Sequence, residues 1–409
     1  MTGGSSARFT GGSRGPTIVR ERPLLSQCIM ARILIITGEA SGDLHGANLA
    51  KALKARNPHV SLSGIGGRAM KMAGVELIEE MGKFDVIGMV GPLALIPIIR
   101  RFVMMRRLFR SKRWDTVVFI DHPGLNLRFA YFAKAAGLRV IYYIAPQIWA
   151  WAPWRMRWIK QRVDHVVVIL PFEKSLYDDA GVPCTFVGHP ILDAVAPHYD
   201  RTALRTKFGF ADHERVIALL PGSRAHEVSV LLPILIETAE KLTRLDPKTK
   251  FILAQASSIH DNLLQPLLER SSVPITVVKE QANEVMAVSD LILVASGTAT
   301  LQAAVVGTPM VLCYRTTALT FWVASVVLRF VVRVKWIGLV NLVANRTVVP
   351  ELVQSAATAE RLCEEAVRIL EDRAAYEAMK RDLATVRAAL GEPGASLRAA
   401  DVVLTACQA

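Results

Sequence analysis

The stretch Arg32-Ile33-Leu34-Ile35-Ile36-Thr37-Gly38-Glu39-Ala40-Ser41-Gly42-Asp43 decides how this chain folds. Its first six residues form a largely apolar, isoleucine-rich run, which predicts a buried strand, and a helical pattern starts at Leu44. The small residues between them let the backbone approach a ligand closely, while the start of a helix offers unpaired amides. The alternative is an ordinary strand-to-helix turn in which Ser41 or Asp43 caps the helix. Either interpretation makes this stretch the first βα unit of a parallel sheet.

The same alternation of apolar runs and helical patterns continues along the chain, so we expect an α/β fold. Further strands are expected at 60–65, 116–120, 139–144, 165–169, 216–220, 251–254, 275–278, 291–294 and 310–313. Prolines and charged residues replace the apolar runs over 190–210, which predicts an interdomain linker. We therefore expect two doubly wound, Rossmann-like parallel-sheet domains, 30–200 and 201–409, the second ending in helices. Because such sheets bind ligands at the carboxyl ends of their strands, a central cleft between the facing domains is predicted.

Composition restricts the classes of function. A net charge of +13 over 409 residues indicates an anionic partner, which is nucleic acid, anionic lipid or a phosphorylated substrate. Five scattered cysteines without a CxxC pair are typical of a reduced, cytosolic compartment and disfavour a structural zinc site. No apolar run reaches the ~20 residues that span a bilayer. Residues 1–29 are rich in Gly, Ser and Arg, so we expect a disordered extension, with Met30 as an alternative start.

Asp121 is the main candidate for catalysis. It follows the apolar run 117–120 directly, at the expected edge of the cleft. Partial desolvation there would raise the proton affinity of its carboxylate and suit it to general-base work. The alternative, about equally supported by position alone, is that Asp121 caps the next helix or pairs with an arginine.

Two turns of the second domain are typical of a phosphate site. Gly222 and Ser223 follow a strand and permit close approach, and Arg224 adds a cation suited to bidentate contacts. The second turn offers hydroxyls and amides at the start of a helix, with a glutamine one turn later that can reach a ribose. Helix capping explains part of this pattern without a ligand. The residues of the second turn are Ser296, Gly297, Thr298, Thr300 and Gln302.

Two basic, apolar segments are candidates for contact with a membrane surface. Between 99 and 114, arginines and lysines interleave with apolar residues and acidic residues are absent, which is typical of a surface-bound amphipathic helix. The alternative is a solvated helix face. The expected membrane-facing residues are Arg100, Arg101, Arg106, Arg107 and Arg110, together with Phe321 and Trp322 of a second such segment, 320–336.

Seven short motifs together resemble lipid-A-disaccharide synthase, in order and spacing, over nearly the whole chain from Met30. They lie at 38–43, 120–123, 148–151, 170–173, 187–190, 220–224 and 295–299. The resemblance implies a GT-B glycosyltransferase fold and transfer from UDP-2,3-diacylglucosamine to 2,3-diacylglucosamine 1-phosphate (lipid X). The implied products are UDP and a β-1,6-linked disaccharide 1-phosphate of lipid A biosynthesis in a Gram-negative bacterium. The alternative is another GT-B enzyme of UDP-sugars, such as the peptidoglycan lipid-intermediate transferase or a UDP-sugar epimerase.

Carried over by position, the resemblance makes Asp121 the essential aspartate and places Arg224 and Asn341 on the nucleotide side. Gln302 departs from the family, where a glutamate is common, so a neutral amide would face the ribose. The residues expected in the substrate cleft are Glu39, Ser41, Gly42, Asp43 and His189.

The implied mechanism is an inverting displacement in which Asp121 takes the proton of the acceptor 6-hydroxyl. The chain has no DxD carboxylate pair, so helix N-termini and Arg224 are expected to neutralise the leaving diphosphate, without metal or cofactor. Because the substrates are acylated, a cytoplasmic protein peripheral to the inner membrane is expected, and a homodimer is left open. No nucleic-acid-binding signature is present, so nucleic acid is not expected as a partner.

Overall fold

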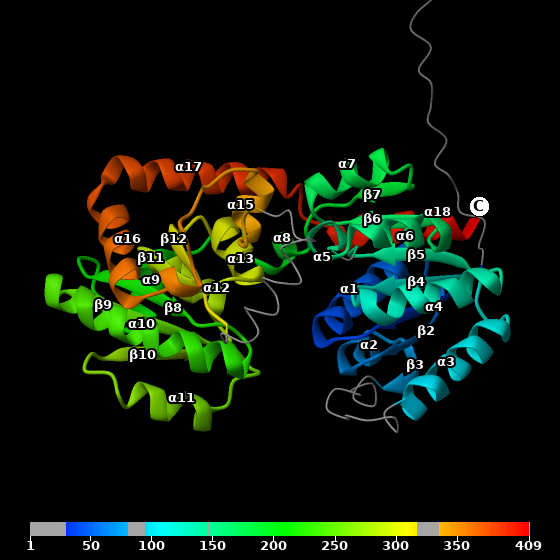
Figure 1. The fold of residues 1–409 in the computed structure, drawn as a ribbon, viewed down its shortest axis with the longest axis horizontal. Helices are drawn as coiled ribbons and strands as arrows, with labels where there is room; N and C mark the ends of the chain where they lie inside the picture. Colours follow the sequence, from blue (N-terminus) through cyan, green and yellow to red (C-terminus); the bar gives the residue numbers. More distant parts are fainter. Residues whose placement is uncertain (1–29, 81–94, 146, 317–334, 409) are drawn as a thin grey trace, which may run out of the picture.

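This computed structural model of the protein describes residues 30–80, 95–145, 147–316 and 335–408, which form two α/β domains (Figure 1). The expected extension 1–29 and the residues Phe321 and Trp322 lie outside the described residues. The first domain contains a parallel sheet in the order β3-β2-β1-β4-β5-β6-β7. Its strands are β1 (Arg32–Thr37), β2 (Ser61–Gly66), β3 (Glu76–Glu80), β4 (Thr116–Ile120), β5 (Arg139–Tyr143), β6 (His165–Val168) and β7 (Cys184–Phe186).

Helices cover both faces of this first sheet. The helices before the linker are α1 (Ala40–Arg56), α2 (Arg68–Met72), α3 (Leu95–Arg110), α4 (Pro123–Ala135), α5 (Ile148–Trp151), α6 (Met156–Arg162) and α7 (Pro171–Asp179), and the short α8 (Ile191–Ala194) contacts α13 of the second domain. Alternate residues of β1 belong to different apolar clusters, because successive side chains of a strand point to opposite faces. Ile33 and Ile35 join the cluster that contains α1, whereas Leu34 and Ile36 join the one that contains α3 and α4. The sheet is therefore doubly wound.

The second domain repeats the plan with a parallel sheet in the order β10-β9-β8-β11-β12-β13. Its strands are β8 (Arg215–Leu220), β9 (Thr249–Gln255), β10 (Ile275–Lys279), β11 (Leu291–Ala295), β12 (Met310–Tyr314) and β13 (Glu351–Val353). The helices that follow the linker are α9 (Arg201–Phe208), α10 (Ala225–Leu245), α11 (Asp261–Leu268), α12 (Ala282–Val288), α13 (Thr298–Val306), α15 (Leu339–Ala344), α16 (Ala359–Glu371), α17 (Arg373–Ala389) and α18 (Ala395–Gln408).

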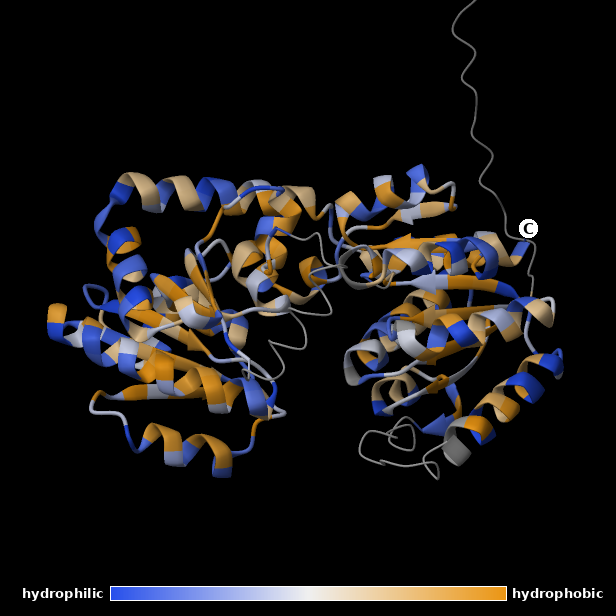
Figure 2. Ribbon diagram, viewed as in Figure 1, coloured by the Kyte–Doolittle hydropathy of each residue, from blue (hydrophilic) through white to orange (hydrophobic). Residues whose placement is uncertain are grey.

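The predicted fold class is confirmed, and every expected strand is present to within about two residues at each end. Hydrophobic colours run along the strands of both sheets, whereas hydrophilic ones gather on the outer helices (Figure 2). All residues of β4 and β11 are buried. Strands buried on both faces appear in the sequence as continuous apolar runs, which is why these strands could be predicted.

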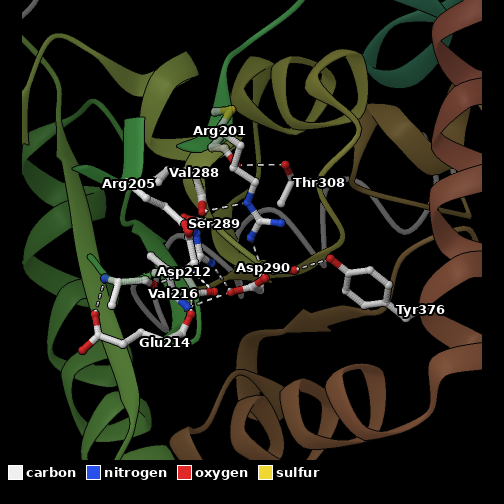
Figure 3. Close-up of polar contacts among 12 residues, drawn as sticks. Arg201, Arg205, Asp212, Glu214, Val216, Val288, Ser289, Asp290, Thr308 and Tyr376 are labelled. Atoms are coloured by element: carbon white, nitrogen blue, oxygen red, sulfur yellow. Dashed lines mark hydrogen bonds and ion pairs between the residues drawn. The ribbon is translucent and has the colours of Figure 1, made fainter. Parts of the chain in front are cut away.

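A polar network around Asp290 attaches the first helix after the linker to the second sheet (Figure 3). The Asp290 carboxylate pairs with Arg201 and with the buried Arg205, and it accepts a hydrogen bond of 2.8 Å from the Val216 amide. The Tyr376 hydroxyl donates to the Asp290 carbonyl oxygen at 3.0 Å. Because Asp290 and Val216 lie at the amino ends of β11 and β8, this network supports the domain at the end opposite to the predicted site.

The last helix returns to the first domain. Figure 1 shows α17 extending along the second domain toward the first and α18, in red, lying against the first sheet. There α18 packs on α1, β4, β5 and β6. Arg56 of α1 pairs with Asp401 at 2.9 Å, and Thr116 of β4 lies 3.2 Å from Cys407. A division of the chain at residue 200 would leave this helix with the second domain, although its packing partners belong to the first.

Candidate functional site

Both sheets have a topological switch point, and the predicted motifs lie at these two points. Strand β1 is bonded to β2 on one side and to β4 on the other, so the chain leaves β1 and β4 in opposite directions. Thr37, the last residue of β1, pairs with Ile120, the last residue of β4, which brings the glycine turn beside Asp121. In the second sheet, β8 and β11 have the same relation. Open α/β sheets bind ligands at such points.

A cavity of about 330 Å³ lies at the switch point of the first sheet, and both domains contribute to it. From the first domain it includes Asp121, Ser41 and His189, and from the second it includes Thr298. Four of the residues predicted from sequence are thus brought together. The complete lining is Ser41, His45, Asp121, Ile144, Ala145, Gln147, Ile148, Ala152, Arg155, Ile169, Leu170, His189, Thr298 and Leu339.

Asp121 and His122 have an unusual backbone at the cavity wall. Their φ angles are +49° and +48°, in the left-handed region that residues with a Cβ seldom adopt. Gly38 lies directly against the His122 ring: a Cβ at Gly38 would stand 2.6 Å from His122 Cγ. Glycine is therefore needed after β1 because the turn that follows β4 lies directly against it.

Two imidazoles share the cavity with Asp121. Burial, with a smaller contribution from the nearby His45, lowers the pKa of His189 to about 4. Burial also lowers the pKa of His45, an effect that the charge of Asp121 opposes. The His189 ring accepts a hydrogen bond at Nδ1 from the Ile191 amide, at 3.1 Å, which assigns the proton of the neutral ring to Nε2. His189 is thus a neutral group at physiological pH.

The other first-domain residues predicted for the cleft have different surroundings. Glu39 is exposed and precedes α1 without a side-chain cap. Asp43 is buried, and its carboxylate accepts from the amides of Gly67 at 2.7 Å and Ala69 at 2.9 Å. It therefore caps α2 rather than α1. Gly42 is buried, with the Thr37 side chain 3.2 Å from where its Cβ would be.

The turn after β8 has a carboxylate at its centre. Gly222 has a φ of +116°, which a glycine tolerates and other residues do not. The Glu227 carboxylate accepts from the Ser223 amide at 3.3 Å and from the Arg224 guanidinium at 2.8 Å. Arg224 itself is largely exposed, with 78% of its side chain accessible. The Glu227 carboxylate thus already binds the Ser223 amide and the Arg224 cation in the turn that was predicted to hold a phosphate.

The turn after β11 is built in part from its own hydrogen bonds. Ser296 Oγ donates to the Ile337 carbonyl at 3.3 Å, and the buried Thr300 hydroxyl donates to the Gly297 carbonyl at 2.8 Å. Thr298 is exposed at the cavity. Gln302 lies one turn into α13, and its Nε2 is 3.4 Å from Asn283 Oδ1.

Asn341 is fully buried, and the protein itself satisfies its amide. Its Nδ2 donates to the Val349 carbonyl at 2.9 Å and to Glu351 Oε1 at 2.7 Å. Its Oδ1 accepts from the amides of Val348 at 2.7 Å and Val349 at 3.0 Å. The side chain therefore connects α15 to the segment that leads into β13, and it presents no open hydrogen-bonding group to the cavity.

Ten of the cavity residues were not predicted as site residues, and those with polar side chains are His45, Gln147 and Arg155. Among the described residues, His45 Nδ1 and Arg155 Nε are buried atoms without a hydrogen-bond partner. His45 lies one turn after the glycine motif, so its helix position was a usable signal. Arg155 follows a short helix and a proline in the tryptophan-rich segment 149–158, and it was not predicted as a site residue.

A larger hollow, of about 700 Å³, is a poorer candidate for the site. It lies around the Asp290 network, with Arg205, Glu214 and Tyr376 in its wall. It opens at the amino ends of β8 and β11, whereas open α/β sheets bind ligands at the carboxyl ends. The charges that line it are also engaged with each other, as for Arg205 and Asp290.

Helix α3 presents most of its predicted basic residues to solvent. Arg100, Arg106, Arg107 and Arg110 are exposed. Arg101 differs, because only 11% of its side chain is accessible and it lies 3.9 Å from Glu79. Burial lowers the pKa of Arg101. None of the helices in the described part of the chain is both long and apolar enough to cross a membrane.

Solved structures share this architecture of two facing parallel-sheet domains. A UDP-GlcNAc 2-epimerase from Neisseria meningitidis bound to UDP-GlcNAc has a TM-score of 0.59, covering 91% of this chain and 100% of that chain, at 13% identity. MurG from Acinetobacter baumannii has a TM-score of 0.58, covering 92% and 99%, at 14% identity. The fold is that of the GT-B class of glycosyltransferases and UDP-sugar epimerases.

Sequence comparison identifies one family within this fold class. A family model described as Lipid-A-disaccharide synthetase matches residues 33–404. The lipid-A-disaccharide synthase of Trichlorobacter lovleyi is 42% identical over 375 residues, 91% of this chain and 97% of that protein. Lipid-A-disaccharide synthase 1 of Legionella pneumophila is 37% identical over 376 residues, with coverage of 91% and 97%. The chain belongs to the lipid-A-disaccharide synthetase family, which confirms the resemblance identified from its motifs.

Proposed function

We propose that this protein transfers 2,3-diacylglucosamine from its UDP derivative to 2,3-diacylglucosamine 1-phosphate, giving UDP and the β-1,6-linked lipid A disaccharide 1-phosphate. The observation that carries the proposal is the position of Asp121: it follows the central strand β4 and lines a cavity to which both domains contribute. Membership of the family supplies the substrate class. The reaction is a transfer between two molecules, and a site between two domains suits it.

Asp121 acts as the general base in this proposal. Its carboxylate takes the proton from the acceptor 6-hydroxyl as that oxygen attacks the anomeric carbon and UDP leaves with inversion. The neutral His189 and the partly buried His45 flank the base, so they can donate or accept hydrogen bonds to sugar hydroxyls without neutralising the carboxylate.

Charge on the leaving diphosphate is neutralised by the second domain. The N-termini of α10 and α13 both follow strands at the switch point of the second sheet. Partial positive charge at these ends and the Arg224 guanidinium stabilise an anion. For Arg224 to reach a diphosphate, it exchanges its contact with Glu227 for one with the donor. Because the chain has no DxD carboxylate pair, we expect activity without an added metal ion.

The acylated substrates place the enzyme at the inner-membrane surface, on the cytoplasmic side. Helix α3 is the proposed contact, through its exposed Arg100, Arg106, Arg107 and Arg110. The apolar Ile99 and Val103 are also exposed on this helix, at 58% and 44%. Each cation near an anionic leaflet contributes about 1 kcal/mol. Arg101 is left out of this contact because its side chain is largely buried beside Glu79.

The peptidoglycan transferase and the UDP-sugar epimerases are the less favoured functions. Solved proteins of these kinds resemble this chain at 12–14% identity, which shows a common fold alone. The named synthases reach 37–42% identity over nine-tenths of the chain.

Mass spectrometry of the reaction products tests the proposal. The purified protein is incubated with diacylated UDP-glucosamine and diacylglucosamine 1-phosphate, and in parallel with UDP-GlcNAc alone. We expect a tetraacyl disaccharide phosphate only in the first mixture, with chelator present or absent. The absence of disaccharide in the first mixture would contradict the proposal, and so would epimerised UDP-GlcNAc in the second, which NMR detects because an epimer has the same mass.

A further inference from the structure

The backbone at Asp121 needs support from its surroundings. A left-handed conformation is unfavourable for a residue with a Cβ, and here two such residues, Asp121 and His122, follow each other. Conformations of this kind persist where neighbouring groups enforce them, and they are concentrated at active sites. The backbone angles of Asp121 also set the direction in which its carboxylate leaves the strand end.

Two buried side chains hold the carbonyl group of Asp121. The Tyr142 hydroxyl, on the neighbouring strand β5, donates to this oxygen at 2.6 Å. Asn126 Nδ2, in the first turn of α4, donates to the same oxygen at 2.8 Å and to the Ile120 carbonyl at 3.2 Å. Tyr142 is completely buried and Asn126 is 2% exposed. A relaxed backbone at Asp121 would turn its carbonyl away from both donors.

The two polar groups are costly to place in this core. A buried hydroxyl or amide destabilises a protein unless it is hydrogen-bonded, and an apolar side chain of the same shape would avoid the problem. Tyr142 packs in a hydrophobic cluster with Phe119 and Leu127. Burial raises the pKa of the Tyr142 hydroxyl well above its usual value, so it remains a proton donor to the carbonyl at every working pH.

We propose that Asn126 and Tyr142 are positioning residues for the reaction: by binding the Asp121 carbonyl oxygen, they keep this backbone left-handed and its carboxylate directed into the cavity between the domains. The inference rests on the proposed function, because it assumes that Asp121 is the base. Neither side chain lines the cavity, so both act through Asp121 and not on the substrate.

The test is a double-mutant cycle in the full-length protein. Tyr142→Phe removes only the hydroxyl, and Asn126→Leu removes both hydrogen bonds of the side-chain amide while keeping the branched shape. Each substitution is introduced into the parent protein and into the Asp121→Ala variant. For every protein, kcat, the donor KM and the UDP affinity are measured. Tyr177→Phe is the matched control, because Tyr177 is equally buried in the same cluster and its hydroxyl has no hydrogen-bond partner among the described residues.

In the parent, we expect Tyr142→Phe to lower kcat about 3- to 10-fold and Asn126→Leu about 10- to 30-fold, since one hydrogen bond corresponds to about 0.5–1.5 kcal/mol. Donor KM and UDP affinity should stay within twofold, and Tyr177→Phe should match the parent. In Asp121→Ala, both changes should alter the residual rate less than twofold, because the carboxylate that they position is gone.

Equal losses with and without the Asp121 carboxylate would overturn the inference, and so would an unchanged kcat in folded Tyr142→Phe. The proposed function fails separately: if Asp121→Ala itself keeps the parent rate, Asp121 is not the base. Should Asn126→Leu fail to fold, the milder Tyr142→Phe still decides the question.

Discussion

Replacing Asn341 by leucine should damage stability far more than nucleotide binding. Leucine has the same branched shape as asparagine, with two methyl groups in place of the amide oxygen and nitrogen, and cannot make any of the four hydrogen bonds of the amide. Three of these bonds involve buried backbone groups of Val348 and Val349. At about 1 kcal/mol for each bond, the expected loss is about 4 kcal/mol of unfolding free energy. That is a large part of the 5–15 kcal/mol typical of a domain.

Urea unfolding and calorimetric titration with UDP, both at low temperature, separate the two roles of Asn341. We expect a clearly lower urea midpoint and a UDP Kd within about threefold of the parent. Asn262→Leu is the control, because Asn262 is exposed on α11 of the same domain, and it should change neither quantity. A UDP Kd raised tenfold or more at parental stability would refute the reasoning, since it would require direct contact between Asn341 and the nucleotide.

Four further outcomes are expected. Asp121→Ala should keep UDP affinity and lower turnover by about 10²- to 10⁴-fold, the usual contribution of a general base, and a near-parental rate would exclude it from that role. Arg224→Ala should weaken UDP binding about 10-fold or more in calorimetry, while an unaltered Kd would mean that the arginine serves only Glu227. Burial raises the pKa of Glu173 to about 7, above its unfolded value near 4.5, so unfolding free energy should fall by about 3 kcal/mol as pH rises from 5 to 8. Glu173→Gln should make the unfolding free energy, measured by urea titration, nearly independent of pH between 5 and 8. If the variant shows the same pH dependence as the parent, Glu173 is not its cause. Sedimentation with anionic vesicles should fall, without loss of UDP binding, in a variant with glutamate at the exposed α3 positions Arg106, Arg107 and Arg110; parental sedimentation across a salt series would show a merely solvated face.

The sequence determined ten of the thirteen strands in the described residues, together with the motifs at their carboxyl ends. Strands such as β4 and β11 are buried on both faces, so each appears in the sequence as a continuous apolar run that can be recognised locally. The edge strands β3, β7 and β13 were not predicted. Two are only three residues long, and β3 is partly exposed along its length, so each has too few buried residues to produce a pattern.

The tertiary structure decided which polar residues are available for chemistry. Asp43 and Asn341 have residue types and sequence positions that are typical of site residues. Their side chains nevertheless form hydrogen bonds with backbone groups of other segments, so they are not available to a ligand. Conversely, His45 and Arg155 line the cavity of Asp121, although neither was predicted as a site residue. The packing of α18 against α1 of the first domain was likewise decided by the tertiary structure. Each depends on contacts between residues far apart in the chain, which hydrophobic periodicity and turn motifs do not encode.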